Sequence, residues 1–277
     1  MAQTINTNVL SINAQRNAST SQTALSVSMQ RLSSGLRVNS AKDDAAGLAI
    51  AERMSSQIRG MNVAIRNAND AISLAQTAEG ATGKIGDALQ RMRELAVQSA
   101  NGTNNEGDRD NLDTEFQQLK AEVTRLIDGT KFNGTALLNS ASTLTFQVGA
   151  GTEATDRIDV DMDDLKTSVD TAISALEVTG ADNSLANAAI DALDDAITAV
   201  TDARANFGAV QNRFDSVIAN LQVSAENLTG ARSRIVDADF AVETAALSRS
   251  QILQQAGNAM IAQANQQPQL VLSLLRG

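Results

Sequence analysis

Few side chains in this sequence could do chemistry, and those few lack the partners that catalysis needs. His and Cys are both absent, so the chain has neither an imidazole that moves protons near neutral pH nor a thiol nucleophile. Asp159, Asp161 and Asp163 repeat the first spacings of a calcium-binding loop, but Asp164 stands where that loop needs glycine. We interpret these carboxylates as the solvent side of a strand, and the sequence predicts no enzyme and no metal site.

Two glycine motifs resemble nucleotide-binding loops, but the residues around each motif do not fit such a loop. Gly149, Gly151 and Ala154 have the spacing of the dinucleotide fingerprint, but a strand-like pattern follows where a helix should begin. Gly83 and Lys84 lack both the opening glycine and the metal-binding hydroxyl of a phosphate-binding loop. We interpret the first motif as a hairpin turn and the second as part of a helix, so no cofactor is expected.

The strongest pattern in the chain is a heptad repeat over residues 210–259, where small and apolar residues recur in alternating steps of four and three. A helix of this length would extend about 75 Å and needs a partner along its length. The repeat is rich in Ala and Ser, so one partner helix would stabilise it only weakly and neighbouring subunits should contribute. The positions expected to pack are Val217, Leu221, Leu228, Ile235, Val242 and Ile252.

The rest of the sequence also predicts a mainly α fold. Helical spacing runs over residues 5–32, from a cap at Asp43 or Asp44 to about residue 100, over 108–128 and from residue 185 onward. Alternating residues at about 143–162 predict a small β-hairpin. We expect a break near residues 230–238 through which the heptad phase continues, and a helix end at Gln266–Pro268 that leaves Leu270–Leu275 as an exposed apolar tail.

Charge divides the chain into two ends and a middle. The net charge is −10, yet no Asp or Glu occurs in residues 1–42 or after Glu243. Acid-free ends can pack in many copies without stacking carboxylates, so we expect residues 1–43 and 237–277 to pair as antiparallel coiled-coil helices and the acidic middle, residues 44–236, to form a solvated helical bundle. The six basic residues of the two ends form no cluster of the kind that binds nucleic acid, and the sequence shows no signal peptide or membrane span, so we expect no nucleic-acid and no membrane partner.

Three long segments in order carry a resemblance to bacterial flagellin. They are Leu32–Met54 (LSSGLRVNSAKDDAAGLAIAERM), Gln90–Asn101 (QRMRELAVQSAN) and the C-terminal stretch that begins at Arg232 with RSRIVDADF. The resemblance covers essentially the whole chain, while the large variable outer domains of many flagellins are missing. It implies a secreted, extracellular subunit that self-assembles into the flagellar filament for motility, with the paired ends lining the filament channel.

The same resemblance implies partners. Flagellins are exported unfolded with the help of a chaperone, polymerise under a cap at the distal tip and meet hook-junction proteins. Those that Toll-like receptor 5 recognises use residues that match Arg91, Leu95 and Glu115, against which stands the interpretation of an ordinary solvated helix face. The alternatives for function are a hook–filament junction protein, which caps rather than polymerises, and a secreted coiled-coil module that binds a receptor or membrane.

Overall fold

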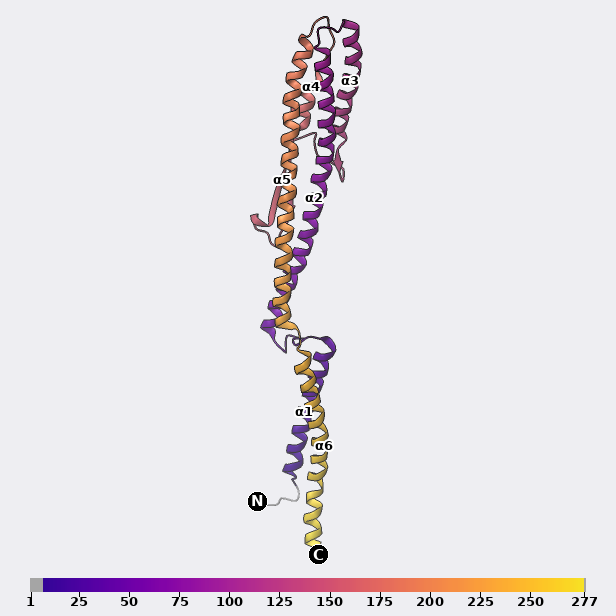
Figure 1. The fold of residues 1–277 in the computed structure, drawn as a ribbon. Coiled ribbons are helices and arrows are strands. Elements are labelled where there is room, and N and C mark those ends of the chain that lie inside the picture. The colour runs from indigo at the N-terminus through magenta and orange to yellow at the C-terminus, as the bar shows by residue number, and fades with distance from the viewer. Residues whose placement is uncertain (1–6, 277) are drawn as a thin grey trace. The chain divides into compact units, whose positions relative to one another are not determined.

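The structure is a computed structural model that describes residues 7–276, with side chains described up to Gln266. It contains two compact units: a terminal unit of Met1–Ser56 with Asn227–Gly277, and a central unit of Gln57–Glu226. Its helices are α1 (Val9–Ser34), α2 (Ala45–Ser99), α3 (Glu106–Gly129), α4 (Thr171–Ser174), α5 (Ser184–Val236) and α6 (Phe240–Arg276) (Figure 1). The predicted mainly α fold class is therefore confirmed.

Local sequence sets where the helices begin and end. The Asn8 side chain accepts the Ser11 backbone N–H at 3.1 Å, and the Asp44 carboxylate accepts the Gly47 N–H at 2.8 Å, as the sequence predicts for a cap of the second helix. α1 ends at Gly35, whose φ of +72° is a left-handed conformation that glycine adopts without strain. These caps satisfy backbone donors and acceptors that a helix end leaves open.

The central unit buries its apolar side chains. α2, α3 and α5 lie side by side in Figure 1 and enclose one continuous core. Its largest fully buried side chains are Phe116, Phe207, Phe214, Ile85, Leu89, Met92, Leu95, Ile127, Leu137, Leu138, Leu165 and Ile173. Because most of these residues recur at helical spacing on one face of each helix, the hydrophobic pattern alone brings the helices together.

Short strands pack against this core. β3 (Ser142–Gln147) and β4 (Arg157–Met162) pair in antiparallel register, which confirms the predicted hairpin, and β1 (Lys131–Phe132) pairs with β2 (Thr135–Ala136). β4 alternates exposed and buried residues, and its outward Asp159 and Asp161 accept hydroxyl hydrogens from the opposite strand. The short helical segments η1 (Ala154–Asp156) and η2 (Lys166–Asp170) flank β4.

The glycines of the dinucleotide-like motif lie in the turn of this hairpin. A Cβ on Gly149 would lie only 1.8 Å from the Asp156 carboxylate, so glycine is needed there because this carboxylate fills the turn. The Asp156 side chain accepts the Glu153 N–H at 3.2 Å. The motif therefore builds a turn, as the sequence predicts.

Two expectations about the C-terminal part have opposite outcomes. The predicted break is confirmed, because α5 ends at Val236 and α6 begins at Phe240. The predicted helix end at Gln266–Pro268 is wrong, since α6 continues to Arg276. A proline removes one backbone donor and bends a helix, but flanking Gln, Leu and Ala residues favour helix strongly enough to continue it. The side chains of the expected apolar tail lie outside the described residues.

Candidate assembly surface

In the terminal unit, α1 and α6 pack antiparallel along their length (Figure 1). Near one end of the pair, the Asn8 amide donates to the Ala264 carbonyl and the Ser11 hydroxyl donates to the Asn265 side chain, both at 2.7 Å. Farther along, a Cβ on Gly257 would lie 3.4 Å from the Cβ of Ala18. The two helices therefore approach closely at this point, because Gly257 and Ala18 are both small.

The buried side chains between α1 and α6 are small or polar rather than apolar. Ser11 and Ser28 of α1 are buried, and so are Glu243 and Ser250 of α6. Glu243 and Ser250 lie seven residues apart and Ser11 and Ser28 lie two heptads plus three residues apart, spacings that fit the alternating three- and four-residue steps of a seam between paired helices. The apolar side chains that are half-buried at the same helical spacing are Leu25, Leu32, Leu247 and Ile261. The seam therefore buries apolar surface only in part, and α1 and α6 stabilise each other less than fully buried apolar side chains would.

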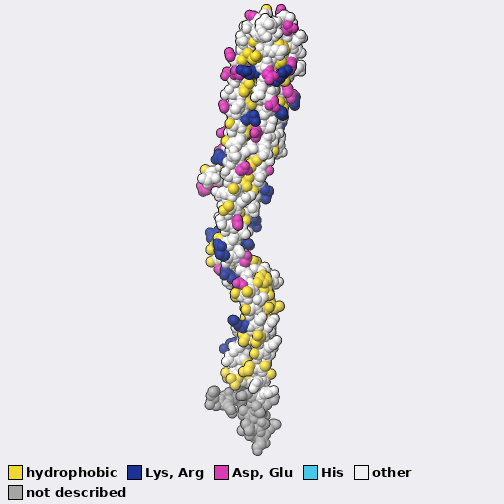
Figure 2. Space-filling view, in the orientation of Figure 1, with side chains coloured by type: hydrophobic (Ala, Val, Ile, Leu, Met, Phe, Trp, Pro, Cys, Tyr) yellow, Lys and Arg dark blue, Asp and Glu magenta, His cyan; other side chains and the backbone are white. Residues whose placement is uncertain are grey.

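The large apolar side chains of this unit face outward instead. This outer apolar set consists of Val9, Leu10, Ile12, Val27 and Met29 on α1, and Phe240, Val242, Ile252, Leu253 and Met260 on α6. Figure 2 shows hydrophobic side chains gathered with few charged ones on the visible face of these two helices. Ala241, Val242, Ala245, Ala246 and Arg249 also line a shallow, mostly apolar hollow of about 420 Å³. Contiguous exposed apolar surface of this kind marks an interaction surface.

The heptad pattern of α5 does not continue in the same phase into α6. The residues that it predicts for the contact are not the residues of α6 that face α1. Val217, Leu221, Leu228 and Ile235 are half-buried along α5, but Val242 and Ile252 are 64% and 66% exposed. Within one chain, the expectation of a continuous seam is therefore wrong for α6. The three residues between α5 and α6 are not helical, so they do not advance the chain by the helical 100° per residue, and α6 presents a different face to α1.

A clasp of backbone and side-chain contacts holds the break in place. Leu36 and Asp237 form an antiparallel bridge, and the Ala238 N–H donates to the Gly35 carbonyl at 2.9 Å. The Arg37 guanidinium donates to the Ile235 carbonyl at 2.6 Å and to the Arg234 carbonyl at 3.3 Å. A cation at the C-terminal end of α5 also interacts favourably with the helix dipole. The clasp therefore fixes where α6 begins beside α1.

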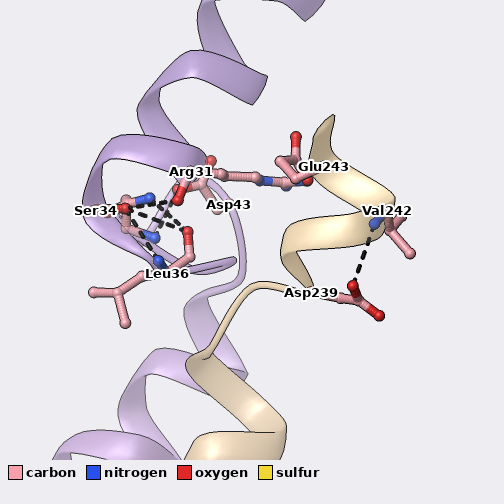
Figure 3. Close-up of polar contacts among 8 residues, drawn as sticks. Arg31, Ser34, Leu36, Asp43, Asp239, Val242 and Glu243 are labelled. Atoms are coloured by element: carbon pink, nitrogen blue, oxygen red, sulfur yellow. Dashed lines mark hydrogen bonds and ion pairs between the residues drawn. The ribbon is translucent and has the colours of Figure 1, made fainter. Parts of the chain in front are cut away.

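Charged side chains surround this clasp (Figure 3). Arg31 reaches across to Glu243 at 3.8 Å, and the Asp239 carboxylate caps α6 by accepting the Ala241 and Val242 N–H groups. The carboxylate of Asp43 accepts the Ser40 hydroxyl and the backbone N–H groups of Ser40 and Asn39, bonds that hold its pKa below the ordinary value. These contacts order the loop between α1 and α2.

The central unit carries a second candidate surface, which the sequence analysis marked as Arg91, Leu95 and Glu115. Arg91 of α2 pairs with Glu115 of α3 at 2.9 Å and with Glu94 at 2.9 Å, and the hydrogen bonds that it donates to Glu94 and then to Glu115 raise its pKa. Both partners of the cross-helix pair are about half exposed. Leu95 is only 1% exposed, and its predicted role in receptor recognition stays a prediction. It lies on the face of α2 that packs into the core.

Comparison with known proteins decides the family. The family model for the bacterial flagellin N-terminal helical region matches residues 5–143, and the model for the C-terminal helical region matches residues 190–275. A flagellin of Halalkalibacterium halodurans is 49% identical, over 98% of this chain and 99% of its own length. The chain belongs to the bacterial flagellin family. Since the relative is matched over almost its whole length, the predicted short form without large variable outer domains is confirmed.

Solved structures agree with this membership. A crystal structure of Bacillus cereus flagellin matches with a TM-score of 0.51 and 35% identity, covering 60% of this chain and 94% of that one. A putative flagellar hook-associated protein of Vibrio parahaemolyticus has a TM-score of 0.62 at 15% identity, covering 70% of this chain and all of that one, which shows a shared fold.

Family membership gives the chain its role. It is a structural subunit of the bacterial flagellar filament, an extracellular polymer of identical copies, and the alternative of a junction protein is not favoured. Among the described residues, none of the helices is long and apolar enough to cross a membrane. The sequence analysis identified the family from the three matching segments, but it missed the outward direction of the apolar residues in α1 and α6, for which the heptad pattern held no signal.

Proposed function

We propose that the outer apolar set is the surface through which this subunit joins the filament. The observation that carries the proposal is the orientation of α1 and α6, whose most buried residues in the seam are serines and Glu243 while the outer apolar set faces water. Each large apolar side chain contributes about 1.5–3 kcal/mol when it is buried. Lengthwise packing against neighbouring copies would bury the set, and such contacts must repeat along a screw axis to give a filament.

Charge favours the same packing. α1 contains no acidic residue, and the one acid of α6, Glu243, is buried beside Arg31. Copies can therefore approach along these helices without repulsion between exposed carboxylates. On this basis, residues 1–43 and 237–277 form the inner coiled-coil layer that lines the channel, and residues 44–236 form the surrounding helical layer. Of the six packing positions predicted from the sequence, Val242 and Ile252 then make contacts between copies.

Seeded elongation tests this surface. Ile252→Asp puts a charge into the outer apolar set without touching the α1–α6 seam, so the monomer should keep the circular dichroism spectrum of the wild type while filament fragments elongate at least about a hundredfold more slowly. Ile252→Leu keeps the apolar volume and should elongate normally. Normal elongation by Ile252→Asp would refute the proposed surface.

Assembly partners follow from the same surface. An exposed apolar set would associate prematurely inside the cell, so we propose export in an unfolded form, protection of the C-terminal region by an export chaperone, and ordered addition beneath a filament cap beyond the hook-junction proteins. Purified protein mixed with filament seeds distinguishes this from the junction alternative. A filament subunit lengthens the seeds, whereas a junction protein leaves their length unchanged.

A second candidate function is recognition by Toll-like receptor 5 through Arg91 and Glu115. The exposed cross-helix pair supports it, because the guanidinium and carboxylate lie on one surface of α2 and α3. Leu95 would act by holding this part of α2 against the core. Arg91→Ala combined with Glu115→Ala should lower receptor signalling at least tenfold, on the order of two lost charged hydrogen bonds.

The matched control for this test is the exposed pair of Lys84 and Asp87 on the same helix. Lys84→Ala combined with Asp87→Ala should leave signalling within about twofold of wild type, since it removes a similar solvated pair elsewhere on α2. Equal signalling by both double variants would remove Arg91 and Glu115 from the recognition surface.

A further inference from the structure

Methionine is the readily oxidised side chain of this protein, because the sequence has no Cys, Trp, Tyr or His. The methionines of the described residues differ widely in exposure. Met29 of α1 and Met260 of α6 are 57% and 61% exposed, whereas Met92 and Met162 of the central unit are 0% and 2% exposed. Met54 and Met61 of α2 are half-buried. Among the methionines that the structure describes, an oxidant in solution therefore meets Met29 and Met260 well before the others.

We propose that Met29 and Met260 are oxidation sites that switch off assembly of the free subunit, with a hydroperoxide as the co-reactant. A lone pair of the thioether sulfur attacks one peroxide oxygen, the S–O bond forms and the O–O bond breaks. When the oxidant is hydrogen peroxide, the departing hydroxide takes up the proton of the hydroxyl group now bound to sulfur and leaves as water. The sulfur loses two electrons to the peroxide, and the product is methionine sulfoxide.

Both sites belong to the outer apolar set, so the inference rests on the proposed function of that surface. Neither residue lies in the buried seam of Ser11, Ser28, Glu243 and Ser250, so oxidation leaves the contact between α1 and α6 intact. A sulfoxide is strongly polar, and packing it against a neighbouring copy without a hydrogen-bond partner costs free energy. The relation also holds in reverse, since a copy within the filament shields the same two sulfurs from oxidant.

The test treats dilute monomer with hydrogen peroxide, maps the sulfoxides by peptide mass spectrometry and then measures seeded elongation. Met29 and Met260 should be oxidised at least tenfold faster than Met92 and Met162, and oxidised monomer should elongate seeds about tenfold more slowly than untreated monomer. Methionine sulfoxide reductases should restore elongation by the oxidised protein, and this part of the experiment uses the wild-type sequence. Filaments treated in the same way should show little oxidation at Met29 and Met260.

Variants assign the effect to the two sites. Met29→Leu combined with Met260→Leu keeps apolar side chains of similar volume and should elongate at the untreated rate after peroxide. Met54→Leu combined with Met61→Leu is the matched control and should remain sensitive. The inference is overturned if oxidised wild type elongates normally, if the first double variant stays sensitive, or if Met92 and Met162 react as fast as the exposed pair. Untreated wild type that fails to elongate seeds would instead refute the proposed assembly surface.

Discussion

The central and terminal units use similar helices with their apolar residues turned in opposite directions. In the central unit, Phe207 and Phe214 of α5 are fully buried with Leu89 and Met92 of α2. In the terminal unit, side chains such as Phe240 and Ile252 of α6 are exposed, while serines lie between the helices. The first arrangement stabilises a single chain. The second leaves apolar side chains exposed, so that they can be buried when copies associate.

This difference shows how one sequence can separate folding from assembly. Burying apolar surface is the main favourable contribution to the free energy of both folding and assembly. A side chain that folding has buried is no longer available to be buried by assembly. The central unit uses it within the chain, so this unit should be stable as a monomer. The terminal unit leaves it for neighbouring copies, so its stability should depend on protein concentration.

The largest effect that we expect is a loss of stability in the central unit. Phe207→Ala should lower the free energy of unfolding of this unit by about 3–5 kcal/mol, because it removes a fully buried ring and leaves a cavity. Thermal unfolding of dilute monomer measures the change. Ser28→Ala in the terminal seam, also buried, should shift it by no more than about 0.5 kcal/mol. Similar losses in the two variants would contradict the contrast between the units.

A smaller effect should come from the close approach of α1 and α6. Gly257→Leu would force the helices apart at Ala18 and should destabilise the pair by about 1–3 kcal/mol, despite the better helix propensity of leucine. Faster amide hydrogen exchange in α1 would report this. Gly208→Leu is the control, because a side chain there meets open space. Unchanged exchange in Gly257→Leu would mean that the close contact is not formed in solution.

Loss of the α6 cap should have a still smaller effect. Asp239→Ala leaves the Ala241 and Val242 N–H groups without their carboxylate partner, which should cost about 1 kcal/mol and fray the first turn of α6. Backbone chemical shifts of residues 240–243 measure the fraying. Asp237→Ala is the control, because it removes an equal charge from a residue that does not cap α6. Equal fraying in the two variants would mean that the loss of charge, and not the loss of the cap, causes the fraying.

Acid should weaken both units mildly. The Arg93 guanidinium donates to Asp194 and lowers its pKa from 3.8, and hydrogen bonds from Ser40 lower the pKa of Asp43. A carboxylate with a lowered folded-state pKa contributes stability above its unfolded pKa and loses it as the pH falls through the folded value. The melting temperature should therefore hold above about pH 5 and fall below about pH 4. Asp194→Asn should flatten this fall, and an unchanged fall would exclude the pair as a contributor.

Much of the fold could be read from local signals. The cap at Asp44, the turn at Gly149 and the alternation in residues 157–162 each depend on neighbours in the sequence, so their structure was predictable. The exposed pair of Arg91 and Glu115 was predictable only through the family resemblance. The burial of Leu95 could be read from local signals as well, because Leu95 follows Met92 by three residues and continues the apolar face that Ile85 and Leu89 begin.

The sequence by itself determined the helices, the hairpin, the break between α5 and α6, the acid-free ends and the family, because these depend on periodicity, composition and matching segments. Only the tertiary structure decided which face of α6 meets α1. Three non-helical residues, 237–239, separate α5 from α6, and the backbone bridge between Leu36 and Asp237 sets the rotation at which α6 begins. That rotation turns Val242 and Ile252 to solvent, since a helix shows its partner one face and exposes the other.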